Sequence, residues 1–374
     1  MKRISIVQPY IPDYRVPFFE RLSLGLGKEG IKLQVVAGLP SGEQAKRGDS
    51  VSPPWLKKVE NRTITAFGRT ATVSLTRSIW KNDDAVIFPH LGSSLDANLA
   101  LAHRQGAKIG LWGHIASYTG PANAVDAAIE KWQLRRADHV FAYTPSGASY
   151  ARSAGVLERN VTTVMNTFDT SALEKSVSSV DDQTQTHFRL TEGIPDGPLV
   201  AYLGALDQAK QTHLLAASLD VLWLHHPDVH VAIGGQGADA HLFDQGVRRG
   251  QVTMLGRVTG ARKAALLATA RAIANPGRIG LLAVDALVAQ RPIVTTRWPF
   301  HGPEVEYLSP GINLHVAESD PESFADTVAR IVYAPPTDQS VAWVYPKLDD
   351  MVRNFSTGIH HLLGCEAENA LEQA

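Results

Sequence analysis

The sequence of 374 residues contains a single cysteine, Cys365, and no apolar run long enough to span a membrane. One cysteine excludes an intrachain disulfide and a cage of thiolates around a metal. Apolar runs shorter than about 18 residues exclude a spanning helix. Residues 1–7 begin with basic residues but lack a long apolar core, so they predict a first strand rather than a secretory signal. We expect a cytoplasmic protein, with peripheral contact at the inner face of the membrane left open.

Neither sign of charge dominates, because 36 Lys and Arg residues stand against 37 Asp and Glu residues, for a formal net charge of −1. Bulk binding of nucleic acid usually requires a strongly basic face, so no nucleic-acid partner is expected. The chain has no G-x-S-x-G segment, which disfavours a serine hydrolase. Its first strand-to-helix loop lacks G-x-G-x-x-G, which weakens the interpretation as a dehydrogenase.

A metal site is not expected either. The adjacent pairs His225-His226 and His360-His361 would place their side chains in diverging directions on a helix. No D-x-D pair stands in a loop suited to a divalent ion bound to a nucleotide. No oligomeric state is predicted.

What the chain does contain is a regular alternation of short apolar runs with helical patterns. In the first half this alternation predicts a parallel sheet with helices between its strands. The expected strands are 4–7, 33–37, 85–88, 108–112, 139–143 and 161–165. The expected helices are 16–26, 96–105, 122–136 and 146–154.

A second alternation follows a polar segment that is rich in Ser, Thr, Asp and Gln. Its expected strands are 199–203, 229–233, 252–255, 272–275, 293–296 and 312–315. Its expected helices are 212–225, 238–246, 262–269, 281–289, 303–308 and 321–331, with a last helix at 347–363. We therefore expect an α/β fold of two doubly wound Rossmann-like domains facing across a cleft, which is the default active site.

The predicted domain bounds follow from the change in composition. Residues 1–168 form an N-terminal domain, and 169–197 form a linker with one helix around 171–177. Residues 198–345 form a C-terminal domain. Residues 346–374 carry a helix that crosses back. A chain of this length suits two such domains.

The most informative segment is the strand, Gly-bearing loop and helix at 272–289. Its loop, Asn275 to Leu281, carries Pro276, Gly277 and Gly280. Such a loop offers backbone N–H groups at a helix start, where the dipole favours an anion. Asp285 lies one turn into the helix, where an otherwise apolar sequence makes a carboxylate unfavourable without partners. The unit can hold a phosphate and a polyhydroxylated group, or it can be only a tight turn.

Together with further segments, this unit resembles the retaining glycosyltransferases of family 4, which have the GT-B fold, in a subgroup with a P-G-x-x-G-L donor loop. The other segments are Tyr202–Lys210, Ile233–Gly237, Leu255–Val258 and Gly302–Glu304 in the second half. In the first half they are Gln8–Phe19, Trp112–His114 and Asn166–Asp169, and near the end Asn354–Ile359. The resemblance covers nearly the whole chain.

The resemblance implies a nucleotide-diphosphate sugar as donor, a UDP-sugar first and a GDP-sugar second, with no cofactor and no metal. Asp285 would hold the ribose hydroxyls and Lys210 the diphosphate. The loop residues Gly277, Arg278, Ile279, Gly280 and Leu281 would bind the donor, and the backbone amides of the last three would engage its sugar and phosphates. Two positions depart from the family pattern, since Gly277 replaces an acidic residue and Ala205 an arginine, for which Arg278 is a candidate substitute. The remaining donor-side candidates are Gly204, Gly256, Arg257, Val258 and Glu304.

On the acceptor side the resemblance places His114 beside the reacting carbon of the donor. Asp13, Tyr14 and Arg15, in the loop after the first strand, are candidates for the acceptor. Simpler roles remain for each: a hydrogen-bonded loop histidine, a surface arginine, a solvated Lys210, an exposed Asp285, or a purely structural Glu304 at a helix start. Lys57, Lys58, Arg62 and Arg69, near Trp55 and Phe67, are either a membrane contact or a solvated face.

The function expected from the resemblance is transfer of a sugar, with retention, to a hydroxyl acceptor in assembly of a surface polysaccharide or another glycoconjugate. Charge on the protein would stabilise the leaving diphosphate. Two alternatives stay open. One is a sugar-nucleotide epimerase of the same architecture. The other is a non-catalytic protein that binds a nucleotide sugar, as Gly277 and Ala205 suggest.

Overall fold

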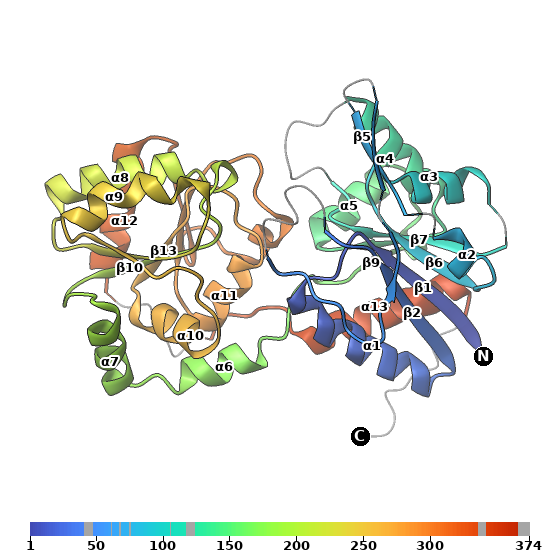
Figure 1. Ribbon diagram of the computed structural model, residues 1–374, viewed down its shortest axis with the longest axis horizontal. Coiled ribbons are helices and arrows are strands. Elements are labelled where there is room, and N and C mark those ends of the chain that lie inside the picture. Colours follow the sequence, from blue (N-terminus) through green and yellow to red (C-terminus); the bar gives the residue numbers. More distant parts are fainter. Residues whose placement is uncertain are drawn as a thin grey trace. The chain divides into compact units, whose positions relative to one another are not determined.

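The larger parallel sheet of the computed structural model has the strand order β3-β2-β1-β6-β7-β8-β9. The structure describes residues 1–40, 48–60, 62–66, 69–74, 76–104, 106–116, 124–335 and 342–365. The strands of this sheet are β1 (Lys2–Gln8), β2 (Ile31–Ala37), β3 (Lys57–Lys58), β6 (Ala85–Pro89), β7 (Lys108–Gly113), β8 (His139–Ala142) and β9 (Val161–Thr163). The chain runs outward from β1 to β3, then returns to β6 on the other side of β1, so the sheet is doubly wound (Figure 1).

Helices connect these strands within the first unit, which comprises residues 1–169 and 346–374. They are α1 (Val16–Lys28), α2 (Arg77–Trp80), α3 (Leu95–Ala102), α4 (Ala124–Arg136), α5 (Pro145–Ser153) and α13 (Leu348–Leu363), with the 3-10 turns η1 (Asp13–Arg15) and η3 (Glu158–Asn160). A small antiparallel pair, β4 (Arg62–Ala66) and β5 (Arg69–Val73), stands apart from the sheet.

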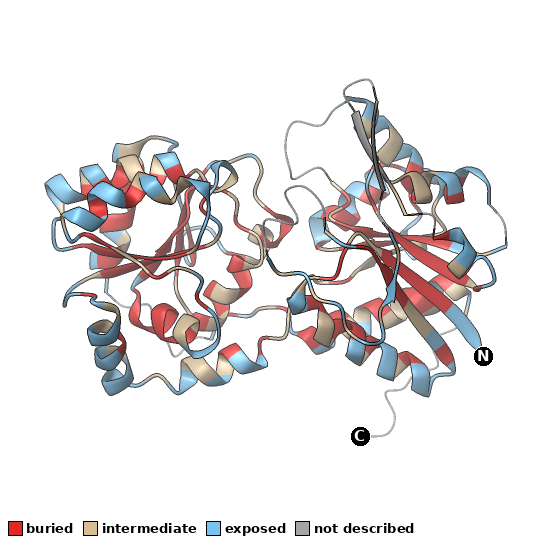
Figure 2. Ribbon diagram, viewed as in Figure 1, coloured by how far each residue is buried: buried red, intermediate tan, exposed pale blue. Residues whose placement is uncertain are grey.

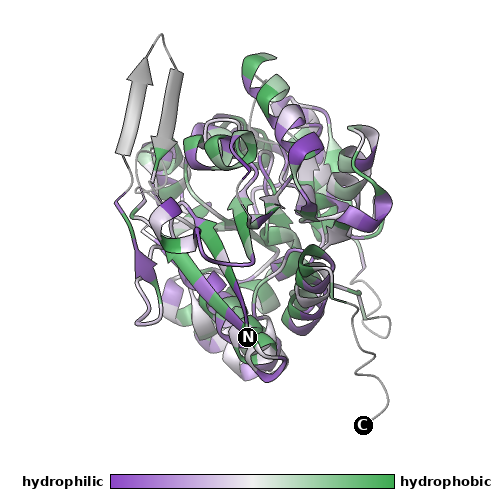
Figure 3. Ribbon diagram, turned by 90° about the vertical axis from the view of Figure 1, so that its right-hand side faces the viewer, coloured by the Kyte–Doolittle hydropathy of each residue, from purple (hydrophilic) through white to green (hydrophobic). Residues whose placement is uncertain are grey.

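The core of the first unit includes α13, although this helix comes from the far end of the sequence. Phe355 of α13 stacks on Phe141 of β8 at 4.5 Å between ring centroids and meets Phe18 of α1 at 5.2 Å. Met351 and Ile359, on the same helix, are wholly buried. The strands beneath are apolar and buried, as Figures 2 and 3 show. One cluster of apolar side chains, with members from Ile4 to Leu362, thus joins the two ends of the described chain.

The second unit, residues 170–345, has its own parallel sheet in the order β12-β11-β10-β13-β14-β15. Its strands are β10 (Leu199–Leu203), β11 (His230–Gly234), β12 (Val252–Met254), β13 (Ala272–Ala274), β14 (Ile293–Thr296) and β15 (Leu314–Ala317). Its helices are α6 (Ser171–Ser178), α7 (Asp182–Glu192), α8 (Thr212–His225), α9 (Asp244–Arg248), α10 (Gly260–Thr269), α11 (Leu282–Ala289) and α12 (Pro321–Tyr333), with the 3-10 turns η4 (Gln208–Lys210), η5 (Ala238–Phe243) and η6 (Pro303–Tyr307).

The winding direction of this sheet reverses between β10 and β13, which are hydrogen-bonded neighbours. In doubly wound sheets a ligand binds beyond the carboxyl ends of the strands at such a reversal. The loops that follow β10 and β13 therefore lie where such a ligand is expected. The expected α/β class with two doubly wound sheets is confirmed.

The structure differs from the expectation in the polar interval 169–197. Two helices are present there, and both pack against α10 within the second unit. The second of them, α7, has Asp181 as its N-cap, accepting from the Thr184 amide at 2.8 Å, and ends at Gly193 in the left-handed conformation. The sequence did not predict α7 because its residues are mostly polar, and Phe188 is the one residue of this helix that is buried.

Smaller differences concern single elements. Segment 238–246 begins as a 3-10 turn, and the predicted helix 303–308 is instead the 3-10 turn Pro303–Tyr307. The strand β3, the β4–β5 pair and α2 were not predicted. Gln105 and Ala122, at the ends of two predicted helices, lie outside the described residues.

Candidate active site

The loop after β10 and the loop after β13 are joined at the reversal point of the second sheet. The amide of Arg278 donates to the carbonyl of Ala209 at 2.9 Å. In return the Lys210 ammonium donates to the carbonyl of Arg278 at 2.5 Å. Lys210 closes the short turn η4, whose N-cap Asp207 accepts from the Lys210 amide. The predicted phosphate lysine thus lies against the predicted donor loop, residues 275–281.

Gly277 is required by this close approach of two backbones. A Cβ at this position would lie 2.3 Å from the carbonyl carbon of Lys210 and 2.6 Å from the carbonyl oxygen of Ala209. Those atoms belong to the main chain, so they cannot move aside cheaply. Any side chain at 277 therefore displaces the loop. The departure from the family's acidic residue has a physical cause in the packing of this chain.

Gly204, the first residue after β10, also allows the close contact between the two loops. Its φ of +149° is rare for residues with a side chain. A Cβ here would lie 3.0 Å from Cε of Lys210. The glycine thereby leaves room for the lysine side chain as it crosses toward Arg278.

The start of α11 offers two unengaged backbone donors. Among the residues that the structure describes, the N–H groups of Gly280 and Leu281 meet no protein acceptor, whereas the N–H of Ile279 donates to Nδ1 of His301 at 3.2 Å. Of the three amides expected to engage the sugar and phosphates, that of Ile279 is therefore occupied. The two others stand where the helix dipole favours an anion.

His301 is a neutral imidazole in a fixed tautomer. Because Nδ1 accepts from the Ile279 amide, Nε2 carries the proton and donates to the carbonyl of Thr296 at 3.0 Å. Burial lowers the pKa of His301, and the positive charges of Lys210 and Arg278 lower it further. Sequence reasoning assigned this residue no role, since its acceptor function exists only once loop and turn meet.

Arg278 has its side chain anchored, with Nε donating to the carbonyl of Phe300 at 2.9 Å. The influence of both Arg278 and Lys210 on His301 places two cations near one imidazole.

Asp285 has a partner that the sequence did not reveal. Its carboxylate accepts from the ammonium of Lys263, on α10, at 2.7 Å, and the two side chains are 15% and 23% exposed. The expected alternatives were ribose hydroxyls or an exposed helix face. The carboxylate is mostly buried and paired with a lysine, which fixes its orientation.

Glu304 is 4% exposed and follows Pro303 at the start of η6. Its Oε2 lies 2.7 Å from the position that a Cβ on Gly302 would occupy and 3.8 Å from that of Gly280. The carboxylate thus lies beside the loop that opens α11, where it can accept hydrogen bonds from a bound hydroxyl.

Asn275, the first residue of the donor loop, is fully buried. Neither Oδ1 nor Nδ2 has a hydrogen-bond partner within the described part of the chain. A buried polar group without partners is uncommon and calls for an explanation such as a ligand or a water. Nothing in the sequence pattern had singled out this side chain.

Three of the remaining donor-side candidates, Gly256, Arg257 and Val258, follow β12, two strands from β10 in the sheet. Gly256 has a φ of +64°, Val258 is 8% exposed and Arg257 is exposed. They lie at the same end of the sheet as the donor loop. No contact between them and that loop is described.

In the first unit, the acceptor-side candidate Arg15 is buried, so the interpretation as a surface arginine is wrong. It is 4% exposed and donates to Oδ1 of Asn166. Its guanidinium lies 5.2 Å from the ring centroid of Trp112 and 5.5 Å from that of Tyr143. Such stacking favours a cation, and the planar group suits it.

His114 shares this aromatic surrounding. Its ring meets that of Tyr143 edge-on at 4.8 Å. Its carbonyl oxygen lies 2.6 Å from where a Cβ of Gly147 would be, so α5 packs directly on the strand end. Asp13 and Tyr14 are exposed beside Arg15. The structure thus brings the four candidates to the carboxyl ends of β1 and β7.

The basic surface near Trp55 is described only in part. Lys57 and Lys58 are exposed, while Trp55 contacts Phe19 at 5.9 Å and donates to Glu20 at 3.3 Å. The side chains of Arg62 and Arg69, and all of Phe67, lie outside the described residues. In the described part, no helix has both the length and the apolar character to cross a membrane. Nor does that part contain three or more His, Cys, Asp and Glu side chains arranged around a metal position.

Two doubly wound sheets, each with its candidate residues at strand carboxyl ends, define the GT-B fold, and comparison with solved structures supports this. A glycosyltransferase from Rickettsia africae is 14% identical, with a TM-score of 0.70 over 98% of this chain and 99% of that one. Anabaena Alr3699/HepE in complex with UDP and glucose is 14% identical, with a TM-score of 0.62 over 96% and 99%. The UDP-GlcNAc 2-epimerase of Methanocaldococcus jannaschii is 13% identical, with a TM-score of 0.58 over 96% and 100%.

Within that fold, residues 197–333 match the family model described as Glycosyl transferases group 1. The matched part contains both loops of the reversal point together with α10 and α11. No curated protein matches the chain by sequence at a significant level.

Proposed function

We propose that the protein is a retaining glycosyltransferase that moves a hexose from a nucleotide-diphosphate sugar to the hydroxyl of a glycan, glycolipid or small molecule. A UDP-sugar is the favoured donor, and a GDP-sugar is the second candidate. The observation that carries the proposal is the pair of unengaged amides, Gly280 and Leu281, at the start of α11 beside Lys210. The family match over residues 197–333 agrees with it.

In this proposal the second unit binds the donor. The amides at the start of α11 hold one phosphate, and Lys210 with Arg278 neutralises the charge that builds on the departing diphosphate. Asp285, oriented by Lys263, accepts hydrogen bonds from the ribose hydroxyls. Glu304 accepts one from the donor sugar, in place of the side chain that Gly277 cannot carry.

The acceptor is bound by the first unit, near Asp13, Tyr14 and Arg15. His114 lies next to the reacting carbon. With retention, the attacking and leaving groups use the same face of the sugar, so an oxygen of the leaving diphosphate can take the acceptor's proton. No separate general base is then required. Assembly of a surface polysaccharide or another glycoconjugate, in the cytoplasm at the membrane's inner face, is the setting we propose.

The first experiment is a thermal-shift measurement with UDP, GDP, ADP, TDP and CMP, followed by the matching nucleotide sugars. A nucleotide that binds the native state raises the midpoint of unfolding by mass action. Loss of the shift in Asp285→Ala, with Lys175→Ala as an exposed control, supports the site. Absence of any shift at saturating nucleotide contradicts the proposal and favours a non-catalytic protein without donor binding.

A sugar-nucleotide epimerase remains the second candidate, since the fold is also that of the UDP-GlcNAc 2-epimerase named above. The two are separated by nuclear magnetic resonance of the sugar after incubation without an acceptor. Epimerisation changes the configuration of the sugar while it stays attached to UDP. A transferase leaves the donor sugar unchanged apart from slow hydrolysis.

A further inference from the structure

A polar cavity lies in the first unit, at the amino ends of β7, β8 and β9. It has a volume of about 450 Å³ and is lined mainly by Arg104, Lys108, Arg135, Arg136, Asp138 and His361. Lys108 begins β7, and Asp138 immediately precedes β8. His114 stands at the opposite, carboxyl end of β7, and Arg15 follows the carboxyl end of β1 in the same sheet. The cavity therefore does not belong to the site described above.

The charges around this cavity are not balanced. Four cationic side chains face one carboxylate, that of Asp138. This carboxylate is already used by the Ile109 amide at 2.8 Å, by Arg104 at 3.1 Å and by Lys108 at 3.9 Å. Three positive charges remain uncompensated by the lining, before any charge on His361 is counted.

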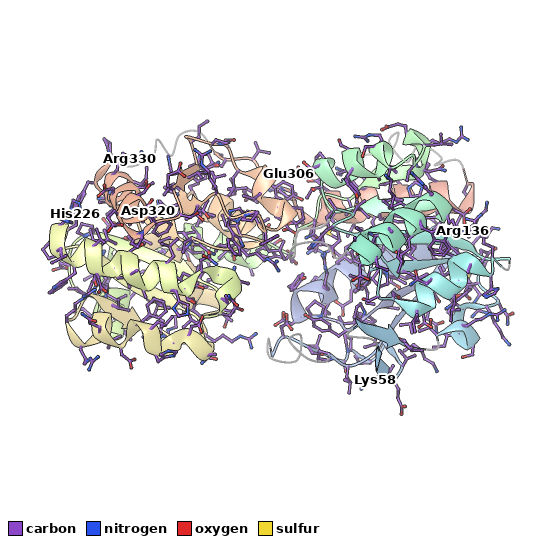
Figure 4. The ribbon with its side chains drawn as sticks, turned by 90° about the horizontal axis from the view of Figure 1, so that it is seen from above. Lys58, Arg136, His226, Glu306, Asp320 and Arg330 are labelled. Carbon is purple, nitrogen blue, oxygen red and sulfur yellow. The ribbon has the colours of Figure 1, made fainter. Side chains whose placement is uncertain are left out.

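Two of the arginines that line the cavity have guanidinium N–H groups without a protein acceptor in the described part of the chain. Arg135 donates through Nε to the carbonyl of Ala154 at 3.2 Å, and Arg136 through Nε to that of Leu101 at 3.0 Å. Within the described residues their Nη atoms meet no acceptor. The guanidinium of Arg136 also lies 5.6 Å from the ring centroid of Trp132. Both guanidinium groups are thus oriented while their remaining N–H groups are available to a ligand. Figure 4 shows Arg136 at the surface of this unit.

We propose that this cavity binds a phosphate or diphosphate group, separately from the donor. Oriented guanidinium groups bind phosphate oxygens in pairs, and this geometry is more specific than that of a lone ammonium. The phosphate can belong to a small soluble molecule or to the headgroup of an anionic lipid. The chemistry of recognition is the same for both.

The test is calorimetric titration of the full chain with inorganic pyrophosphate, alongside flotation with vesicles of phosphatidylglycerol or phosphatidylcholine. The variants are Arg135→Gln and Lys108→Gln, each of which removes a lining charge at nearly constant size. Arg152→Gln is the control, because Arg152 is a partly exposed arginine of the same unit that pairs with Glu158 outside the cavity. All of these variants are compared in a Lys210→Ala background, because this substitution removes pyrophosphate binding at the proposed donor site and leaves the cavity unaltered.

In the Lys210→Ala background we expect pyrophosphate to bind about tenfold more weakly to each cavity variant, and to bind with unchanged affinity to Arg152→Gln. If the protein binds phosphatidylglycerol vesicles but not pyrophosphate, and the two cavity variants lose this binding, the phosphate is assigned to a lipid headgroup. This outcome also supports the site. Binding of either probe that is insensitive to both cavity variants, or no binding at all, overturns the proposal. These outcomes are independent of whether any nucleotide binds the second unit.

Discussion

The carboxylate of Asp285 and the ammonium of Lys263 lie 2.7 Å apart on neighbouring helices, α11 and α10, of the second unit. Both side chains are mostly buried. An isolated buried carboxylate is costly, so the lysine is what allows an acidic residue in the otherwise apolar α11. One carboxylate oxygen is held by Lys263, and the other can still receive a ligand hydroxyl.

Replacement of Lys263 by Met tests whether this pair serves donor binding. We expect the free energy of unfolding to fall by about 1–3 kcal/mol, because a buried acceptor loses its charged partner. We expect UDP to bind about tenfold more weakly, since Asp285 loses its orientation. Lys175→Met, at an exposed position on α6, is the matched control for both measurements. Unchanged UDP affinity in a folded Lys263→Met protein would contradict a role of the pair in the site.

Gly277→Ala tests the contact between the donor loop and η4. The new Cβ would overlap main-chain atoms of Lys210, so we expect destabilisation by about 1–3 kcal/mol and a large loss of transfer. Gly277→Glu would introduce the acidic residue of the family pattern, but we expect it to be less stable and less active than Gly277→Ala because its side chain is larger. In Gly280→Ala the nearest atom to the Cβ is Oε2 of Glu304 at 3.8 Å, so this control should retain its stability. Equal stability of the two alanine variants would refute the steric argument.

His301 should make the stability of the second unit depend on pH. The pKa of His301 is lowered in the folded protein, because burial and the charges of Lys210 and Arg278 disfavour its protonation. Below about pH 6.5 the unfolded chain therefore binds a proton that the folded chain does not, and the free energy of unfolding falls by at most about 1.4 kcal/mol per pH unit.

The measurement is urea unfolding as a function of pH for the wild type and for His301→Asn. The asparagine can still accept from the Ile279 amide but does not titrate. We expect a shallower decline for the variant between the ordinary histidine pKa and the lowered one. Three other buried histidines, His90, His139 and His230, also have lowered pKa values, but they are present in both proteins and contribute equally to both curves. Curves that decline in parallel would therefore show that His301 contributes nothing to the pH dependence.

Asn275→Leu separates a structural role of the buried amide from a role in the site. The replacement removes two polar atoms that lack protein partners and keeps a similar volume, so we expect stability that is unchanged or slightly raised. Donor binding, measured by the UDP thermal shift, should weaken if the amide or a water held by it contacts the ligand. A variant that loses stability but keeps its full UDP shift would show that the amide has hidden structural partners.

Much of the fold was predictable because periodicity and β-branched runs act locally. The bounds of β10, β14 and α8 agree with those expected from the sequence. In contrast, α7 escaped prediction although its capping residues, Asp181 and Gly193, stand in the sequence. Its polar surface gave it the composition of a linker, and only packing against α10 shows that it belongs to the second unit.

The candidate site was predictable in its residues but not in their partners. The resemblance implied that Lys210 and the loop after β13 bind the same diphosphate, and the structure places the two in contact. No local pattern links Asp285 to Lys263, or His301 to the Ile279 amide, since these pairs depend on how separate elements pack. The steric need for Gly277 likewise exists only between two loops that are distant in the sequence.

The place of α13 in the first unit has a consequence for how the chain is made. During synthesis the strands β1 to β9 leave the ribosome well before residues 348–363. Phe18 and Phe141 therefore lack their contacts with Phe355 until the whole second unit has been synthesised. A nascent or prematurely terminated chain therefore exposes an unfinished apolar surface that chaperones and proteases can recognise.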